Sequence, residues 1–174
     1  MNVSLGDDGK QILERAMELA ADRYERLTTL HVLLAFTEAG GLTGQLISRQ
    51  GITAEGVRKA LKSRDSEASS TIDRVSRAAR DLAQRLPGRR QVSALHLLHA
   101  LASVQDTLAF RWLALEHNTA SLTAQILGVL TGTGRRAFHV DVLEPPPDLP
   151  QQPVQLATPA RAQSRTPLIT RWTF

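Results

Sequence analysis

The chain has 174 residues, a formal net charge of +4 at pH 7 and no cysteine. The missing cysteines exclude disulfides, a thiol nucleophile and a Cys-ligated zinc site. Hydrophobic residues make up 42% of the chain but aromatic residues only 4%. The core must therefore be built from Leu, Ala, Val and Ile, which favours helices over sheets. This length indicates one domain, or one compact domain with a tail.

The N-terminal sequence MNVSLGDDGKQ has neither a basic region nor an apolar stretch, so we expect no secretory signal. No apolar run approaches the roughly 18 residues that a membrane span requires. A cytoplasmic location is therefore expected. The basic charge is mostly interspersed with Asp and Glu, as in LERAMELAADRYERL, a pattern typical of solvated, ion-paired helix faces.

The first part of the chain predicts four helices, followed by a polar connector at 63–70. The expected N-caps are Asp7 or Asp8 for the first helix, Thr28 for the second and Thr53 for the fourth. A left-handed Gly51 is expected to end the third helix. Apolar residues follow at helical spacing: Ile12, Leu13, Ala16, Leu19 and Ala20, then Val32, Leu33 and Phe36, then Leu42, Leu46 and Ile47, then Val57, Ala60 and Leu61.

The same order of features then returns. Four further N-caps are expected at Ser70 (with Asp73 as its capping-box partner), Ser93, Asp106 and Asn118. The stretch SALHLLHAL at 93–101 repeats TTLHVLLAF at 28–36 with an offset of 65 residues. Ordered similarity across four helices indicates an internal duplication. We therefore predict an all-α fold of two pseudo-symmetric four-helix repeats, eight helices in all, over about 5–64 and 68–131, because one such repeat alone would bury too little surface.

A change in composition marks the C-terminal part. One proline, Pro87, precedes residue 132 and seven follow it. Proline at this density blocks helices and favours extended chain. We predict a duplicated domain over 1–132 and a linker or disordered, Pro-rich C-terminal tail over 133–174, most mobile over 144–167. The segment AFHVDVLEP at 137–145 fits either a short strand or an extended exit.

With its two LHVLL-like helix starts, the chain resembles the N-terminal domain of the Clp unfoldases. The resemblance covers about residues 5–130 and includes the ending GITAEGVRKAL of the first repeat. It implies two tandem four-helix repeats that bind substrates or adaptors for a Clp-type AAA+ ring. It also implies that the domain itself catalyses nothing, that it holds no cofactor and that its partner is a protein.

One departure from the family concerns the ligand. Clp proteins that bind phosphoarginine carry a Glu before the His of each repeat, whereas this chain has Leu30 and Leu95 there. A carboxylate can pair with a guanidinium and Leu cannot. We therefore expect an apolar or helical partner segment at Leu30 and Leu95, with burial of both in the core as the equal alternative.

Three further residues are candidates for binding. Trp112 can fill the core or line a groove, and Arg89 and Arg90 can be solvated or can contact an acidic partner. His31 and His96 are expected to pack or to cap their helices. His96 and His99 could share a helix face as metal ligands do, but no third ligand is evident, so no metal site is expected.

No sequence of the form GxxxxGK[ST] occurs, so we expect neither ATP binding nor hydrolysis. Protein recognition for a Clp-type unfoldase is the preferred interpretation, and in one reading the chain is the N-terminal part of a longer ATPase. The ending TPLITRWTF resembles the segment that opens the family's ATPase module. The alternatives are a stand-alone adaptor of a Clp ATPase and a basic helical nucleic-acid-binding protein.

Overall fold

A computed structural model of the chain describes residues 4–63, 66–86 and 91–133. The elements within these ranges are β1 (Ser4–Leu5), α1 (Asp7–Ala21), α2 (Thr29–Glu38), α3 (Gly41–Arg49), α4 (Ala54–Leu61), α5 (Ser70–Arg85), β2 (Gln91–Val92), α6 (Ala94–Leu101), α7 (Leu108–Glu116) and α8 (Thr119–Thr131). The prediction of an all-α fold built from two successive sets of four helices is confirmed. The tail expected beyond Thr133 lies outside the described residues.

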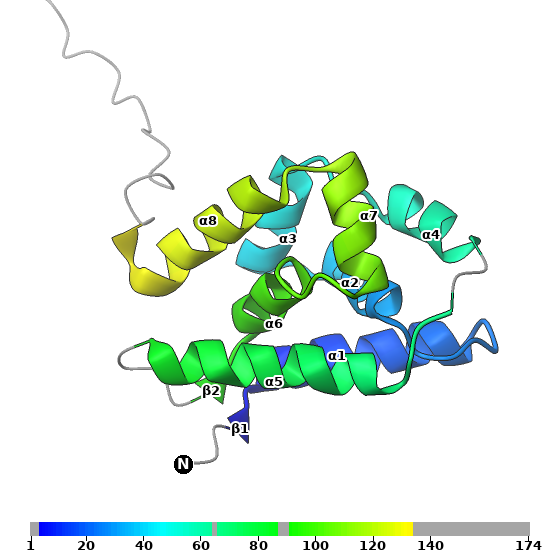
Figure 1. Ribbon diagram of the computed structural model, residues 1–174, viewed down its shortest axis with the longest axis horizontal. Helices are drawn as coiled ribbons and strands as arrows, with labels where there is room; N and C mark the ends of the chain where they lie inside the picture. The colour runs from blue at the N-terminus through cyan, green and yellow to red at the C-terminus, as the bar shows by residue number, and fades with distance from the viewer. Residues whose placement is uncertain (1–3, 64–65, 87–90, 134–174) are drawn as a thin grey trace, which may run out of the picture. The chain divides into compact units, whose positions relative to one another are not determined.

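The helices lie in three layers, and the middle layer consists of α2 and α6 (Figure 1). The long helices α1 and α5 lie along one side, α2 and α6 occupy the centre, and α3, α4, α7 and α8 lie on the opposite side (Figure 1). Every residue of α2 from Thr29 to Phe36 is buried. Its continuous apolar sequence therefore reflects burial on all sides rather than one amphipathic face.

The two repeats make equivalent helix contacts, both within each repeat and between the repeats. Helix α1 packs on α2 as α5 packs on α6, and α2 contacts α4 as α6 contacts α8. Between repeats, α2 contacts α7 and α6 contacts α3. One core of Leu, Ala, Val and Ile side chains, with Phe36 as its one aromatic residue among those described, runs through both repeats.

Several predicted caps are confirmed. Thr28 and Ser93 are the N-caps of α2 and α6, and the side chains of Thr53 and Asn118 accept backbone hydrogen bonds from Gly56 (3.1 Å) and Ser121 (2.9 Å). Gly51 has φ +72° and follows the C-cap of α3, as predicted. Local sequence therefore determines these ends.

Three predicted caps are wrong. Gly6, not Asp7 or Asp8, is the N-cap of α1, and Ser69 rather than Ser70 precedes α5. Thr107 caps α7 by accepting from the Phe110 amide at 2.9 Å, while the predicted Asp106 lies 3.3 Å from Arg74. Each error replaces one oxygen-bearing residue with a neighbour, or with a glycine that offers the same backbone geometry.

A short parallel pairing was not predicted. β1 and β2 pair Ser4 with Gln91 and Leu5 with Val92, and the Gly6 amide donates to the Val92 carbonyl at 2.9 Å. A Cβ on Gly9 would lie 2.9 Å from Leu5 Cδ1, so glycine permits this close approach of α1. Two residues per strand are too few to leave an alternating pattern in the sequence.

Two carboxylates bind across the duplication. Asp8, in repeat one, accepts the amide of Ala94 at the start of α6 (2.9 Å). Glu67, in the connector before α5, accepts the amide of Thr29 at the start of α2 (2.6 Å). Each central helix thus has its first amide hydrogen-bonded by a carboxylate from outside its own set of helices, in the position where a helix dipole favours negative charge.

Candidate functional site

A groove lies over the N-terminal half of α2, between α4 and α7. It consists of two adjoining hollows with cavity volumes of about 570 and 480 Å³, which share Leu30, Ala60, Ser63 and Leu108 in their linings. We refer to these two hollows together as the α4–α7 groove. Since α4 belongs to repeat one and α7 to repeat two, the groove is formed by the packing of the two repeats.

The floor and one wall of the groove are apolar. Leu30 and Leu108 form the floor with only 4% and 6% of their surfaces exposed. Trp112 is half-buried in the wall made by α7, where its ring meets that of His117 edge-on, with 4.9 Å between the ring centroids. A Cβ on Gly56 would lie 3.2 Å from Trp112 Cζ2, so the glycine lets the indole pack closely against α4.

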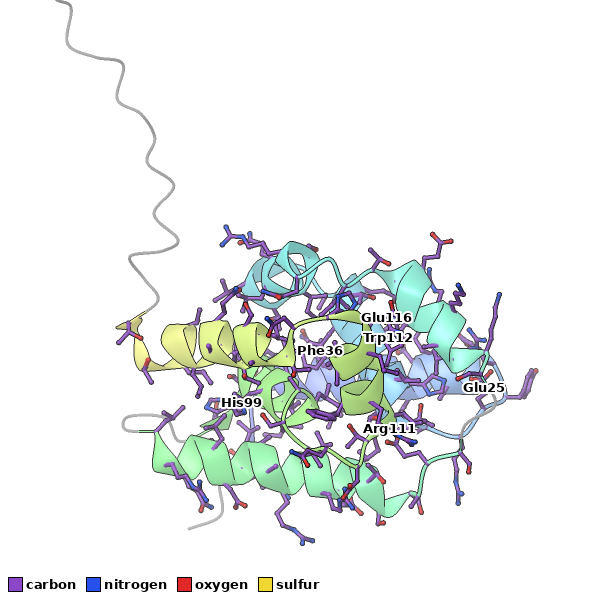
Figure 2. All side chains as sticks on the ribbon, turned by 45° about the horizontal axis from the view of Figure 1, so that its top comes forward. Glu25, Phe36, His99, Arg111, Trp112 and Glu116 are labelled. Atoms are coloured by element: carbon purple, nitrogen blue, oxygen red, sulfur yellow. The ribbon has the colours of Figure 1, made fainter. Side chains whose placement is uncertain are left out.

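Helix α7 also presents side chains that the core does not use. Leu115 is 84% exposed and lines the groove. Arg111, Trp112 and Glu116 lie along the same helix, as Figure 2 shows, and all three belong to the lining. An exposed leucine beside a half-buried tryptophan gives the groove an apolar surface that a partner could cover.

The far end of the groove contains the Glu67 network. Glu67 is buried, and besides the Thr29 amide it accepts from the Thr29 hydroxyl (2.8 Å) and the Leu108 amide (2.8 Å). The Thr29 hydroxyl in turn accepts from the Ala109 amide at 3.0 Å. One carboxylate therefore satisfies the starts of both α2 and α7. It occupies the place where these helix ends would otherwise attract an anionic ligand.

The buried side chain of His31 caps the start of α2. Its Nδ1 accepts from the Thr28 amide at 3.2 Å, so its proton resides on Nε2, which donates to Glu25 Oε2 at 3.2 Å. Burial lowers the pKa of His31, although the Glu25 carboxylate opposes this shift. The neutral ring is thus the form that fits the cap. His96 bonds to the Ser93 amide in the same way, at 3.1 Å, so the expectation that these histidines cap their helices holds in both repeats.

A second hollow, lined mainly by repeat one and by Ala94 of repeat two, has different chemistry. It lies beside the starts of α6 and α3 and has a cavity volume of about 500 Å³. Its lining includes Asp8, Arg15 and Glu38, and the Arg15 guanidinium lies 2.8 Å from Glu38. Arg58 also lies 2.9 Å from Glu38. We refer to this as the α3 hollow; its one cation, Arg15, is paired with Glu38, and Asp8 is bonded to the amides of Gly9 and Ala94.

The structure brings only part of the predicted site together. Leu30 and Trp112 line the same groove, 82 residues apart in sequence, whereas Leu95 is half-buried against the core and absent from the groove lining. Arg89 and Arg90 lie outside the described residues. Sequence reasoning missed Ala60, Lys59, Arg111 and Leu115. The signal available was weak: only Arg111 and Glu116 are polar in α7, so the sequence does not distinguish the exposed Leu115 from a core leucine.

Residues 4–63, 66–86 and 91–133 hold no group of three His, Asp or Glu side chains placed to bind a metal ion. None of the helices that the structure describes is both long and apolar enough to span a membrane.

The described fold is similar to that of a solved structure. The N-terminal domain of the caseinolytic protease associated chaperone ClpD from Arabidopsis thaliana matches with a TM-score of 0.59 and 24% sequence identity, over 72% of this chain and 96% of that chain. No protein-family model matches the chain, and no curated protein matches it. The structural match confirms the fold predicted from the repeats: that of a Clp N-terminal domain.

Proposed function

We propose that this domain recognises substrates or adaptors for a Clp-type AAA+ unfoldase and has no catalysis of its own. The observation that carries the proposal is the α4–α7 groove, an apolar hollow with an exposed leucine and a half-buried tryptophan. It occurs in a fold that the chaperone-associated ClpD domain shares. Grooves of this kind suit segments that bury apolar side chains.

The apolar floor supports a protein partner over a small charged ligand. Leu30 stands where phosphoarginine-binding relatives carry a Glu, and it lies on the groove floor. The nearby helix starts already hold Glu67, so an added anion would meet an occupied position. A phosphoryl ligand is therefore disfavoured here and an apolar segment favoured. The same groove would serve a stand-alone adaptor equally well.

A pair of surface variants tests the role of the groove. Leu115→Ala removes an exposed apolar contact inside the groove, whereas Met17→Ala removes one on α1, outside it; the two residues are 84% and 50% exposed. Neither change should alter folding, since both side chains face solvent. Peptides that bind the full chain on an array of unfolded-protein segments should bind Leu115→Ala about fivefold to tenfold more weakly, the equivalent of partly burying one apolar side chain.

The Met17→Ala control shows which results would contradict the proposed function. Met17→Ala should bind as the unaltered chain does. Equal loss in both variants, or the absence of any binding peptide, would contradict recognition at this groove. Coupling to a Clp ring requires a second measurement: addition of the chain should change the rate at which a Clp ATPase degrades or unfolds a bound peptide fusion, and Leu115→Ala should diminish that change.

A further inference from the structure

We infer that the partner of the α4–α7 groove is an acidic amphipathic helix, which inserts apolar side chains into the groove and places carboxylates against its basic rim. This inference rests on the proposed function and specifies the chemistry of the partner. It follows from the charge balance of the lining, from one strained tyrosine and from the nature of the walls.

The charges that line the groove do not balance. Five cations and three carboxylates belong to it: Arg23, Arg26, Lys59, Lys62 and Arg111, against Glu25, Glu67 and Glu116. Glu25 is engaged by Arg23 at 3.1 Å, and Glu67 by the starts of α2 and α7. Removing these pairs leaves four cations and one carboxylate, Glu116. A carboxylate-bearing partner would supply the missing charge.

The remaining cations have no acidic partner inside the described part of the chain. Within it, no carboxylate oxygen lies within 4.0 Å of Arg26, Lys59, Lys62 or Arg111. The α3 hollow is the internal contrast, because Arg15 there pairs with both Glu38 and Glu18. In the α3 hollow the cation is therefore paired with carboxylates, whereas four cations of the α4–α7 groove are not paired with any described carboxylate.

Tyr24 lies in the chain between Arg23 and Glu25, which line the groove, although it is not itself part of the lining. Its φ is +54°, a left-handed conformation in a non-glycine residue, and its side chain is fully exposed. The turn ends α1 through a bond from the Glu25 amide to the Ala20 carbonyl at 2.9 Å, a closure that glycine makes without strain. A strained position that keeps an exposed aromatic ring indicates that the ring is used in a contact.

The walls of the groove indicate a helical partner. They come from α2, α4 and α7 and from the loops before α2 and after α4, and each described strand is only two residues long. A strand edge that an extended peptide could join is therefore not available at the groove. Recognition then follows the helix-in-groove mode, with apolar anchors on one face and charges along its flanks.

The test uses three fluorescent peptides of about 18 residues, or about five helical turns. All carry the same apolar stripe, with Glu, Lys or Gln at the flanking positions. Binding to the full 174-residue chain is followed by anisotropy at about 0.15 M salt. We expect the Glu peptide to bind at least about tenfold more tightly than the Lys peptide, and the preference to shrink as salt is raised.

Two double variants with the same change in net charge separate the groove from general basicity. Lys59→Gln with Arg111→Gln alters the rim, whereas Arg77→Gln with Arg80→Gln alters exposed cations of α5 outside the lining. The first pair should weaken the Glu peptide about fivefold to tenfold and the second less than about twofold. Tyr24→Gly should weaken it about threefold without unfolding the chain.

The outcomes distinguish this inference from the proposed function. Equal binding of the Glu and Lys peptides, or equal losses in the two double variants, would overturn the acidic partner and leave an apolar groove in place. Failure of all three peptides to bind a chain with native circular dichroism would overturn both. A duplex DNA that outcompetes the Glu peptide and depends on Lys59 and Arg111 would assign the rim to nucleic acid instead.

Discussion

The starts of α2 and α6 share one plan and differ in what surrounds them. Each has a hydroxyl N-cap, a histidine that accepts the N-cap amide, and a carboxylate from outside its own set of helices. At α6 the carboxylate is the exposed Asp8, bonded to Ala94 and to Gly9 beside it. At α2 it is the buried Glu67, which joins two helices.

That difference shows how a duplicated fold can keep one scaffold and change one surface. The local cap is retained in both copies because every helix start needs partners for its first amides. The side chains around it are free to diverge. Beside α6 lies a hollow in which Arg15 is paired with Glu38, and beside α2 lies a groove of apolar side chains with four cations that no described carboxylate pairs.

The largest expected difference between the two starts is in stability. Glu67→Ala leaves the amides of Thr29 and Leu108 buried without acceptors, and should lower the free energy of unfolding by about 3–5 kcal/mol. Asp8→Ala removes one cross-repeat bond at an exposed site and should cost about 1 kcal/mol. Urea denaturation followed by circular dichroism measures both. Equal losses would mean that the two bridges are equivalent.

The leucines before the two histidines should differ next. Leu30 is 4% exposed on the groove floor, so Leu30→Ala should cost about 2–4 kcal/mol. Leu95 is half-buried, and Leu95→Ala should cost about half as much, since it loses less buried surface. Thermal and chemical unfolding of the two variants provide the comparison. A larger loss of unfolding free energy in Leu95→Ala than in Leu30→Ala would contradict the placement of Leu30 on the groove floor.

A smaller effect concerns pH. Burial lowers the pKa of His31 in the folded chain below the ordinary value of about 6.5, with Arg23 adding to the shift and Glu25 and Glu67 opposing it. The unfolded chain therefore binds more protons below about pH 6.5. Stability should be complete above that pH and should fall as the pH drops through the window beneath it, because protonated Nδ1 can no longer accept the Thr28 amide.

A capping-box substitution isolates this contribution. His31→Gln keeps an acceptor at the same helix position but cannot titrate, so unfolding free energies measured between pH 7.5 and about 5 should depend less on pH than those of the unaltered chain. Burial also lowers the pKa of His99, so His99→Gln serves as the companion variant and should remove a separate part of the slope. An unchanged slope in His31→Gln would show that this cap does not titrate.

The smallest expected effect is a gain. Tyr24→Gly relieves a left-handed conformation in the turn that leads towards α2, and should raise the free energy of unfolding by about 0.5–1 kcal/mol. A neighbouring exposed change with ordinary backbone geometry, Arg26→Ala, should leave stability nearly unchanged. Differential scanning calorimetry resolves the two. Destabilisation by Tyr24→Gly would show that the ring contributes to the fold rather than to a partner contact.

The sequence was sufficient to predict the features that depend on nearby residues. The duplication, the helix order, the left-handed Gly51 and the caps Thr28, Thr53, Ser93 and Asn118 all follow from short-range patterns. Choosing between adjacent oxygen-bearing residues, as at Asp106 and Thr107, requires the backbone geometry that only the folded chain provides.

The groove could be predicted only in part. Leu30 was predicted from its place before the histidine of its repeat and Trp112 as a residue that could line a groove, and both line the same groove. The same reasoning also predicted Leu95, which the groove does not include. Glu67 was missed because its partners are 38 and 41 residues away along the chain. Pairing over such distances depends on how the repeats pack, which no local spacing encodes.

The exchanged carboxylates also bear on how this domain can be inherited. Repeat one cut out before Glu67 would lose the acceptor for the Thr29 amide of its own central helix, and would keep Asp8, whose acceptor oxygen serves Ala94 of the other copy. Recombination that moves a single repeat would thus deliver an incomplete part. The pair of repeats is therefore the smallest part of the described chain that contains the acceptors for both of its central helix starts.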